Sequence, residues 1–295
     1  MHAIVMKNIL ITGASGLLGL ELIKSLYPTY NVLPTSKNGF LENSKILDIT
    51  QKDCVVNLIA DFKPSIIINC AAYTAVDKAE TEKKSTRDVN VVGLSNLIKA
   101  SNKRIKIIHI SSDYVFDGKK GDYIETDPTF PVNYYGKTKL ESENLLIGSN
   151  LEFLIIRPNV LYSNDLSKMH FLSWVVNSLS NGEEIKVATD QISNPTYIPD
   201  LLQVISDAIL VNFSGILHIG SEDYISRYDF ANQISDVFGL RNILIKPTES
   251  SFLNQLAERP LNSSLNCSKV KIELNIELYP AVYGIRRVNL SIWKF

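Results

Sequence analysis

Short apolar segments alternate with helical segments through the first half of the chain, and this alternation constrains the fold most. The apolar segments cover residues 8–11, 31–35, 65–70, 105–111 and 151–157, and helical patterns lie between them at 15–27, 53–62, 82–102 and 135–146. Strands that are apolar along their length are covered on both faces, which is typical of parallel sheets. Right-handed crossovers then predict a doubly wound, Rossmann-like α/β fold with its ligand crevice at the carboxyl ends of the strands.

The pattern loosens after about residue 160. Helices are expected at about 168–180, 199–210 and 227–238, with short strands at about 183–188 and 215–219. We therefore expect a dinucleotide-binding domain over residues 1–160. A smaller, mainly substrate-binding lobe is expected over 161–295, and some of its elements are expected to return to the first domain.

Composition excludes several classes of protein. The 295 residues include 30 basic and 31 acidic side chains, so a nucleic-acid-binding protein is not expected. No segment approaches the roughly 18 apolar residues of a membrane span. The cysteines, Cys54, Cys70 and Cys267, are odd in number and far apart, which favours a reducing cytoplasm. The histidines have no zinc-binding spacing, so we predict no metal site.

A glycine motif follows the first apolar segment. Gly13, Gly16 and Gly19 are spaced GxxGxxG between a strand and a helix. Glycine lets the backbone approach a pyrophosphate, and the helix N-terminus offers free N–H groups to its oxygens. A plain strand–helix turn is the alternative, but the position between the first strand and a helix favours a dinucleotide site.

The end of the second strand bears on the choice of cofactor. Ser36 and Lys37 stand where an NAD enzyme usually has an acidic residue, and a basic group suits the 2′-phosphate of NADP. This favours NADP(H) over NAD(H), although Lys37 is equally consistent with an ordinary surface lysine. Asp48 stands where a third loop could reach an adenine amino group, although on its own it is equally an ordinary surface aspartate.

Tyr135 and Lys139 form a YxxxK pair at the start of a predicted helix. Residues four apart share one helix face, and an ammonium beside a phenol lowers the phenol's pKa, which prepares it as a general acid or base. About one such pair is expected by chance in a chain of this composition, so the spacing alone is not informative. Its position after a strand that ends in Ser112 is what favours a catalytic role. Ser112 stands where a hydroxyl could bond a substrate carbonyl, or where a serine simply ends a strand.

Together these motifs resemble the extended short-chain dehydrogenase/reductase superfamily and, within it, the dTDP-4-dehydrorhamnose reductase family. The similarity runs over nearly the whole chain. Its blocks are residues 71–80, 111–118, 131–143, 190–196 and 259–263.

The resemblance implies that Tyr135 protonates the C4 ketone oxygen, that Lys139 binds the nicotinamide ribose and tunes Tyr135, and that Ser112 polarises the carbonyl. We expect the cofactor to contact Gly13, Ser15, Gly16, Leu17, Leu18, Gly19, Ser36, Lys37, Asp48, Ile49, Ala71, Ala72, Thr74, Asn90, Tyr135 and Lys139. The nucleotide-sugar substrate is expected at Ser112, Asp113, Tyr114, Asn159 and Arg259, and a homodimer is possible.

The sequence departs from the family on the sugar side. Val160 stands where related enzymes have a tryptophan, and Ser193 replaces a usual glycine, which puts the exact sugar in doubt. A related epimerase or dehydratase is one alternative, although Asp113-Tyr114 lacks the glutamate that dehydratases carry there. A non-catalytic NADP-binding regulatory subunit is another, because the animal regulatory subunit of methionine adenosyltransferase resembles the same family.

Overall fold

The computed structural model describes residues 6–39 and 43–292 and separates into two compact units. The first unit comprises the chain up to Ser112, Asn133–Ile156 and Ile205–Ile216. The second comprises Asp113–Val132, Arg157–Val204 and the chain from Leu217 onward. The expected assignment of cofactor and substrate binding to residues 1–160 and 161–295 stays a prediction.

The central sheet confirms the predicted α/β class. Its seven strands lie in the order β11 (Gly215–Ile219), β6 (Phe153–Pro158), β5 (Lys106–Ile110), β4 (Ile66–Asn69), β1 (Asn8–Thr12), β2 (Asn31–Ser36) and β3 (Lys45–Ile46). The pairs from β6 to β3 are parallel. All five predicted strands of the first half, β6, β5, β4, β1 and β2, therefore neighbour one another in the sheet, while the two-residue β3 was too short to leave a pattern.

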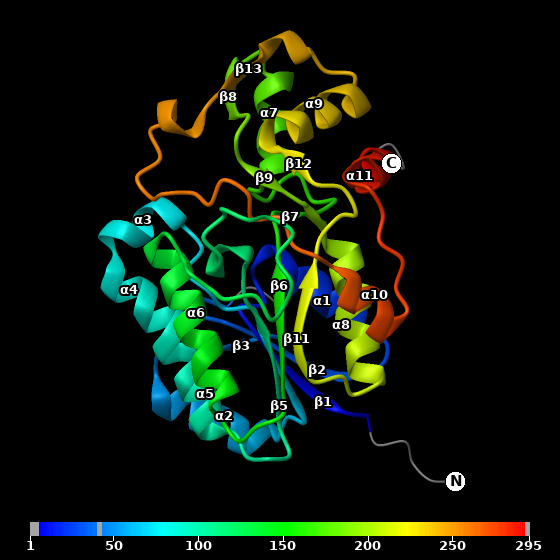
Figure 1. Cartoon of the computed structure of the whole chain (residues 1–295). Helices are drawn as coiled ribbons and strands as arrows, with labels where there is room; N and C mark the ends of the chain where they lie inside the picture. Colours follow the sequence, from blue (N-terminus) through cyan, green and yellow to red (C-terminus); the bar gives the residue numbers. More distant parts are fainter. Residues whose placement is uncertain (1–5, 40–42, 293–295) are drawn as a thin grey trace. The chain divides into compact units, whose positions relative to one another are not determined.

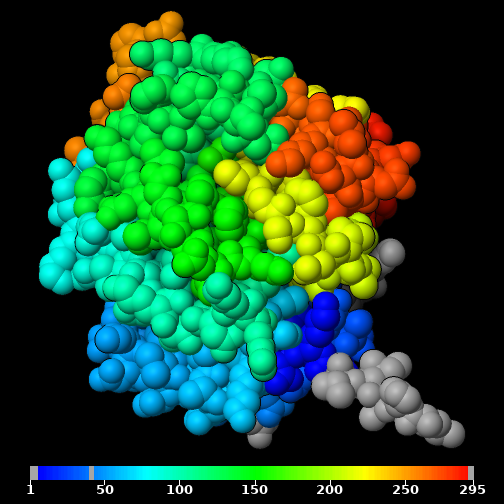
Figure 2. Space-filling view, turned by 60° about the horizontal axis from the view of Figure 1, so that its bottom comes forward, coloured from blue at the N-terminus to red at the C-terminus, as the bar shows by residue number. Residues whose placement is uncertain are grey.

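Helices cover both faces of the first unit's sheet. α2 (Lys52–Phe62), α5 (Leu94–Ala100) and α6 (Tyr134–Ile147) lie side by side on one face, and α1 (Leu17–Leu26) lies on the other (Figure 1). In the space-filling view α2, α5 and α6 form one continuous surface, coloured from light blue through cyan to green (Figure 2). Beneath them Leu10, Ile67 and Ile107 lie in register and form a buried apolar row across three strands.

The single helix expected over residues 82–102 is divided. The segment folds as α4 (Lys83–Arg87), the π-helical turn η1 (Asp88–Gly93) and α5, and a further short helix, α3 (Val76–Thr81), precedes it. Two contacts explain the irregular turn. The Asn90 side chain bonds the backbone of Tyr73, and a Cβ on Gly93 would stand 2.4 Å from a side-chain atom of Ile49. Such π-helical turns often lie at functional sites.

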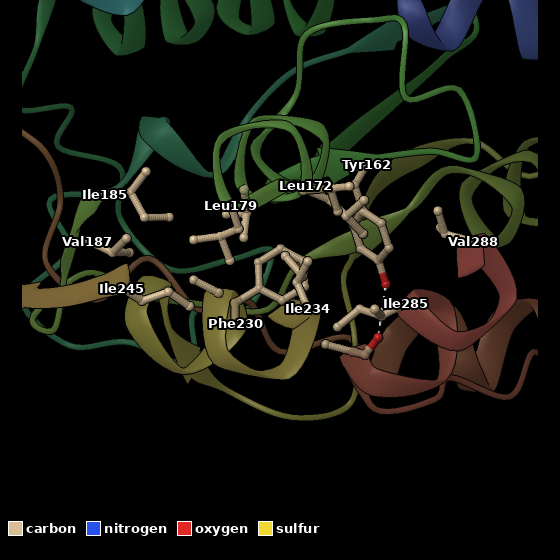
Figure 3. Close-up of a cluster of buried hydrophobic side chains, with 14 of the residues drawn as sticks. Tyr162, Leu172, Leu179, Ile185, Val187, Phe230, Ile234, Ile245, Ile285 and Val288 are labelled. Carbon is tan, nitrogen blue, oxygen red and sulfur yellow. Dashed lines mark hydrogen bonds between the residues drawn. The ribbon is translucent and has the colours of Figure 1, made fainter. Parts of the chain in front are cut away.

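The second unit has short strands and three main helices around its own core. Its other elements are η2 (Asp113–Val115), β7 (Leu161–Tyr162), α7 (Phe171–Ser180), β8 (Ile185–Ala188), β9 (Ile192–Ser193), β10 (Thr196–Tyr197), α8 (Ile198–Leu210, shared with the first unit), β12 (Ile225–Ser226), α9 (Arg227–Phe238), η3 (Asn242–Leu244), β13 (Ile245–Thr248), η4 (Ser250–Phe252), α10 (Ser268–Leu274) and α11 (Ala281–Ile292). Phe230 and Ile234 of α9 pack against Ile185 and Ile245 of the β8–β13 pair (Figure 3). The Tyr162 hydroxyl donates to the Ala281 carbonyl at 3.2 Å and ties this core to α11.

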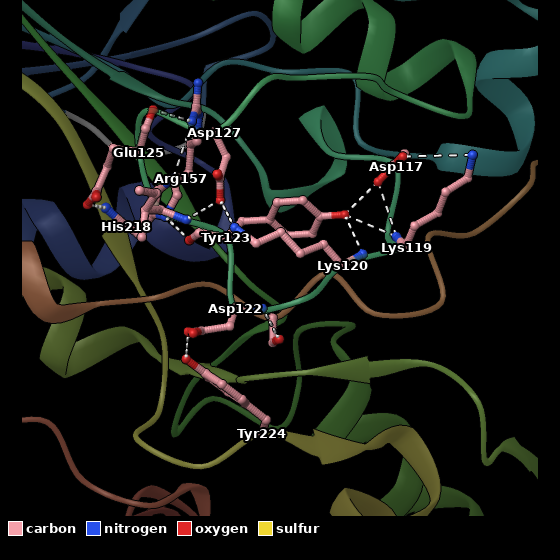
Figure 4. Close-up of polar contacts among 12 residues, drawn as sticks. Asp117, Lys119, Lys120, Asp122, Tyr123, Glu125, Asp127, Arg157, His218 and Tyr224 are labelled. Carbon is pink, nitrogen blue, oxygen red and sulfur yellow. Dashed lines mark hydrogen bonds and ion pairs between the residues drawn. The ribbon is translucent and has the colours of Figure 1, made fainter.

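Residues 113–132 form an irregular segment of the second unit that is held by Tyr123 (Figure 4). The Tyr123 hydroxyl accepts from the backbone N–H groups of Lys119 and Lys120 at 3.0 and 3.1 Å and donates to Asp117 at 2.5 Å. The Tyr123 ring stacks on Phe116 at 4.2 Å between centroids. Among residues 6–39 and 43–292 no helix combines the length and apolar character needed to cross a membrane.

Candidate active site

The predicted glycine motif lies at the mouth of α1. Gly13 has φ of +66°, and a Cβ there would stand 2.5 Å from the Ala71 backbone nitrogen, so only glycine fits. Gly16 caps α1, whose first turn has no side-chain hydrogen-bond cap. A Cβ on Gly19 would stand 2.6 Å from the Ala14 Cα. The open N–H groups at this helix start, next to a backbone without side chains, suit the phosphate oxygens of a dinucleotide.

The end of β2 brings together the residues expected near the adenosine. The Lys37 Nζ lies 3.1 Å from the Asp48 Oδ2, so the two form an ion pair. Burial raises the pKa of Asp48, but hydrogen bonds from the Thr50 backbone and hydroxyl, together with Lys37, outweigh it and leave the pKa below its usual value. In the described part of the chain the Ser36 Oγ is buried without a hydrogen-bond partner. This group is therefore available to a ligand.

Asn90 connects the loop after β4 to α6. Its Oδ1 accepts from the Tyr73 N–H at 2.7 Å, and its Nδ2 donates to the Tyr73 carbonyl at 3.3 Å and to the Thr138 hydroxyl at 2.9 Å. Asn90 thus places the loop that contains Ala71, Ala72 and Thr74. Its amide is engaged within the protein, so the arrangement suits support of the cofactor loop better than direct contact with a ligand.

The tyrosine and lysine of the YxxxK pair lie on α6 as predicted. The Asn133 side chain caps this helix by accepting from the Gly136 N–H at 2.8 Å. Tyr135 and Lys139 are one helical turn apart and both buried. The Lys139 Nζ donates to the Ile110 carbonyl of β5 at 2.7 Å. Burial lowers the pKa of Lys139 to about 8, against the opposing effect of Glu143 and Cys70.

Ser112 follows directly on the strand to which α6 is fixed. The hydroxyl of the preceding residue, Ser111, donates to Glu143 of α6. Ser112 itself is buried. Strand and helix are thus joined at Ile110 and at Ser111, so the chain enters Ser112 from a firmly held position. The first unit therefore contains all three predicted catalytic residues.

The predicted substrate residues after Ser112 lie in the second unit, in two groups. Asp113 accepts from the Ser263 hydroxyl at 2.6 Å, and the Asn159 amide donates to the Ser263 carbonyl at 2.9 Å. Tyr114 is hydrogen-bonded to Arg227 and lies near Arg259. Burial raises the pKa of Tyr114 although both arginines act to lower it.

Sequence reasoning missed Ser263, Arg227 and His109. Ser263 ends the block that was recognised from Arg259, but its bonds to distant residues leave no sequence pattern. Arg227 opens α9, where the helix dipole disfavours a cation, and this placement was a usable signal. His109 is a polar residue inside the buried strand β5, a second signal that was passed over.

The chain is similar over most of its length to several known proteins. Residues 6–289 match the family model described as the RmlD substrate binding domain. The chain is 38% identical over 287 residues to a dTDP-4-dehydrorhamnose reductase of Aggregatibacter actinomycetemcomitans, with 92% of this chain and 95% of that protein covered. A crystal structure of dTDP-4-dehydrorhamnose reductase from Bacillus anthracis in complex with NADP superposes with a TM-score of 0.90 and 30% identity, covering 97% of this chain and 99% of that one. Methionine adenosyltransferase 2 subunit beta of Rattus norvegicus is 30% identical over 301 residues, with 98% and 88% covered.

Proposed function

Because this chain belongs to the dTDP-4-dehydrorhamnose reductase family, we propose that it reduces the 4-keto group of dTDP-4-dehydro-L-rhamnose with NADPH. The product, dTDP-L-rhamnose, serves cell-surface polysaccharide synthesis. The observation that carries the proposal is the fixed Lys139 ammonium, held at 2.7 Å from the Ile110 carbonyl and one helical turn from Tyr135.

Tyr135 is the proton donor in this proposal. When bound, NADPH supplies hydride to the sugar C4. The Tyr135 hydroxyl gives its proton to the ketone oxygen as negative charge develops there, and Ser112 donates a hydrogen bond to the same oxygen. The Lys139 ammonium, one helical turn away, stabilises the phenolate that remains.

The residues of the first unit fit the cofactor. The glycine loop offers backbone N–H groups at the start of α1 for the pyrophosphate. The partnerless Ser36 Oγ and the Lys37 ammonium stand together at the end of β2, where a 2′-phosphate would accept from both. We therefore propose NADPH as the preferred cofactor and NADH as the weaker one.

The test follows NADPH oxidation by absorbance with dTDP-4-dehydro-L-rhamnose generated in the cuvette. The Tyr135→Phe variant keeps the ring and removes only the proton donor, so kcat should fall by about 10²–10⁴-fold with NADPH affinity unchanged. Absence of turnover by the wild type, with NADPH still binding, would contradict the assignment of the sugar.

A non-catalytic cofactor-binding subunit is the second candidate, because 98% of this chain aligns with methionine adenosyltransferase 2 subunit beta. Such a protein would bind NADPH and turn over no 4-keto sugar. The Ser112, Tyr135 and Lys139 set favours the reductase. An epimerase or dehydratase is disfavoured by Asp113-Tyr114 after Ser112.

We also propose a cytoplasmic location and a homodimer. The three cysteines are free thiols, which suits a reducing compartment. Light scattering during size-exclusion chromatography would measure the oligomeric state, and a mass near 33.0 kDa would contradict the dimer.

A further inference from the structure

A row of polar side chains crosses three strands of the first unit's sheet. Thr12, Asn69 and His109 are in register on β1, β4 and β5. Each stands two residues beyond Leu10, Ile67 and Ile107 of the apolar row, so both rows face the same side of the sheet. All three polar residues are at most 2% exposed. Burying polar groups in this way costs free energy unless every group is bonded.

The hydrogen bonds in this row run in one direction. The Thr12 hydroxyl donates to the Asn69 Oδ1 at 2.6 Å, which leaves the Asn69 amide N–H to donate to the His109 Nδ1 at 3.1 Å. Burial and the nearby Lys139 lower the pKa of His109 well below its usual value, so the ring is neutral. With Nδ1 as the acceptor, the ring proton lies on Nε2.

The row ends on α6, the helix of the YxxxK pair. The His109 Nε2 lies 3.1 Å from the Ser142 Oγ, and the Ser142 hydroxyl donates to the Lys139 carbonyl at 2.6 Å. The same Nε2 lies 3.5 Å from the Lys139 Nζ. With its proton on Nε2, His109 is linked to Lys139 by hydrogen bonds through the Ser142 hydroxyl, while the ring lies near the ammonium without a hydrogen bond to it.

We propose that His109 is a positioning residue that fixes Lys139 on β5. The hydrogen-bonded series Thr12–Asn69–His109–Ser142 sets the distance between β5 and α6. This is the turn of α6 from which the Lys139 ammonium reaches the Ile110 carbonyl. The inference rests on the proposed role of Lys139 in cofactor binding and proton donation. A misplacement of about 1 Å at such a site can cost on the order of a hundredfold in rate.

Two substitutions separate hydrogen bonding from packing. His109→Phe keeps a flat ring and breaks both hydrogen bonds. His109→Gln keeps an acceptor toward Asn69 and a donor toward Ser142, because its amide carries one of each. Thr86→Val is the matched control, because among residues 6–39 and 43–292 the buried Thr86 hydroxyl bonds only the Glu82 carbonyl.

The deciding experiment is a double-mutant cycle on NADPH binding, followed by nucleotide fluorescence, with Lys139→Met as the second substitution. In the wild-type background His109→Phe should weaken binding about tenfold, whereas His109→Gln and Thr86→Val should stay within about twofold. In the Lys139→Met background His109→Phe should cause almost no further loss. Equal losses in both backgrounds, or a His109→Gln variant as weak as His109→Phe, would overturn the proposal.

The same variants are then assayed for turnover. His109→Phe should lower kcat at least about tenfold with the KM for the nucleotide sugar nearly unchanged, and His109→Gln should recover most of it. If the wild type reduces no 4-keto sugar, the proposed function fails, while the binding cycle still reports on His109.

Discussion

The two units each contain a buried, neutral histidine, but the two rings have different partners. His109 of the first unit faces the Lys139 ammonium, which can lose its proton. His218 of the second unit lies between the Tyr123 carbonyl, 2.9 Å from its Nδ1, and the Arg157 guanidinium, 3.3 Å from its Nε2 (Figure 4). Burial and Arg157 lower the pKa of His218 to about 3.

The difference shows that burial alone does not give a histidine a functional role. A guanidinium stays charged at every relevant pH, so the Arg157–His218 pair can only hold the segment that contains Tyr123 and Glu125. A lysine with a pKa near 8 responds to its surroundings in the working range. Substitutions around His109 and Lys139 should therefore change activity, and substitutions around His218 and Arg157 should change stability.

The largest effect is expected for Lys139→Met. kcat/KM should fall about 10³-fold, because the ammonium that favours the phenolate is gone. The free energy of unfolding at pH 7 should rise by about 1 kcal/mol. The reason is that Lys139 is only 1% exposed, and burying its positive charge costs free energy. Paired kinetics and urea denaturation measure both.

The matched change in the second unit is Arg157→Met, which should lower stability and leave cofactor binding unchanged. It leaves the His218 Nε2 without its donor and removes a guanidinium that lies 5.2 Å from the Phe116 ring centre. The free energy of unfolding should fall by about 3 kcal/mol with NADPH affinity unchanged. Stabilisation by this change, or loss of NADPH binding in the folded variant, would break the comparison.

Lowering the pH should reduce the folding stability through His218. A histidine whose pKa is lowered in the folded state contributes stability above its unfolded pKa of about 6.5, and that contribution is lost as pH falls toward 3. At pH 5 the loss from His218 is about 2 kcal/mol. Urea denaturation at pH 8 and pH 5 should therefore show a smaller difference for His218→Gln than for the wild type. An equal difference in the two proteins would show that His218 does not titrate in this way.

Raising the pH above 8 should lower kcat/KM through Lys139. Its folded pKa of about 8 lies below the usual value, so the ammonium is present below pH 8 and lost above it. kcat/KM should be level below pH 8 and fall about tenfold per pH unit above it. A pH–rate profile of the wild type tests this. The control variant His218→Gln should show the same fall in kcat/KM above pH 8. A profile flat to pH 10 would contradict the role of Lys139.

The smallest effect is expected outside both clusters, at the exposed Lys37. Lys37→Ala should raise the KM for NADPH about fivefold and leave the KM for NADH unchanged, because only NADPH carries the 2′-phosphate. Lys24→Ala is the matched control, since Lys24 forms a similarly exposed ion pair with Glu21 at 2.7 Å. Equal changes for both cofactors would remove Lys37 from the specificity site.

Local patterns were sufficient for the elements that bury a regular apolar face. Five strands of the central sheet and helices such as α2, α6 and α7 lie where the pattern of their residues predicted them. The division of the segment 82–102 was not predictable, because it depends on Asn90 reaching Tyr73 and on Gly93 meeting Ile49. α10 and α11 were missed. In α11 the buried Ala281, Ile285 and Val288 recur at helical spacing, which was a usable signal.

The sequence by itself determined the α/β class, the glycine loop and the YxxxK pair, because each depends on residues that are close together along the chain. Only the tertiary structure decided what surrounds Lys139. Thr12, Asn69, His109 and Ser142 come from four separate elements, and their hydrogen bonds exist only once the strands are in register and α6 is packed on the sheet. The pKa of a buried lysine depends on these distant groups and on the exclusion of water, neither of which a local pattern records.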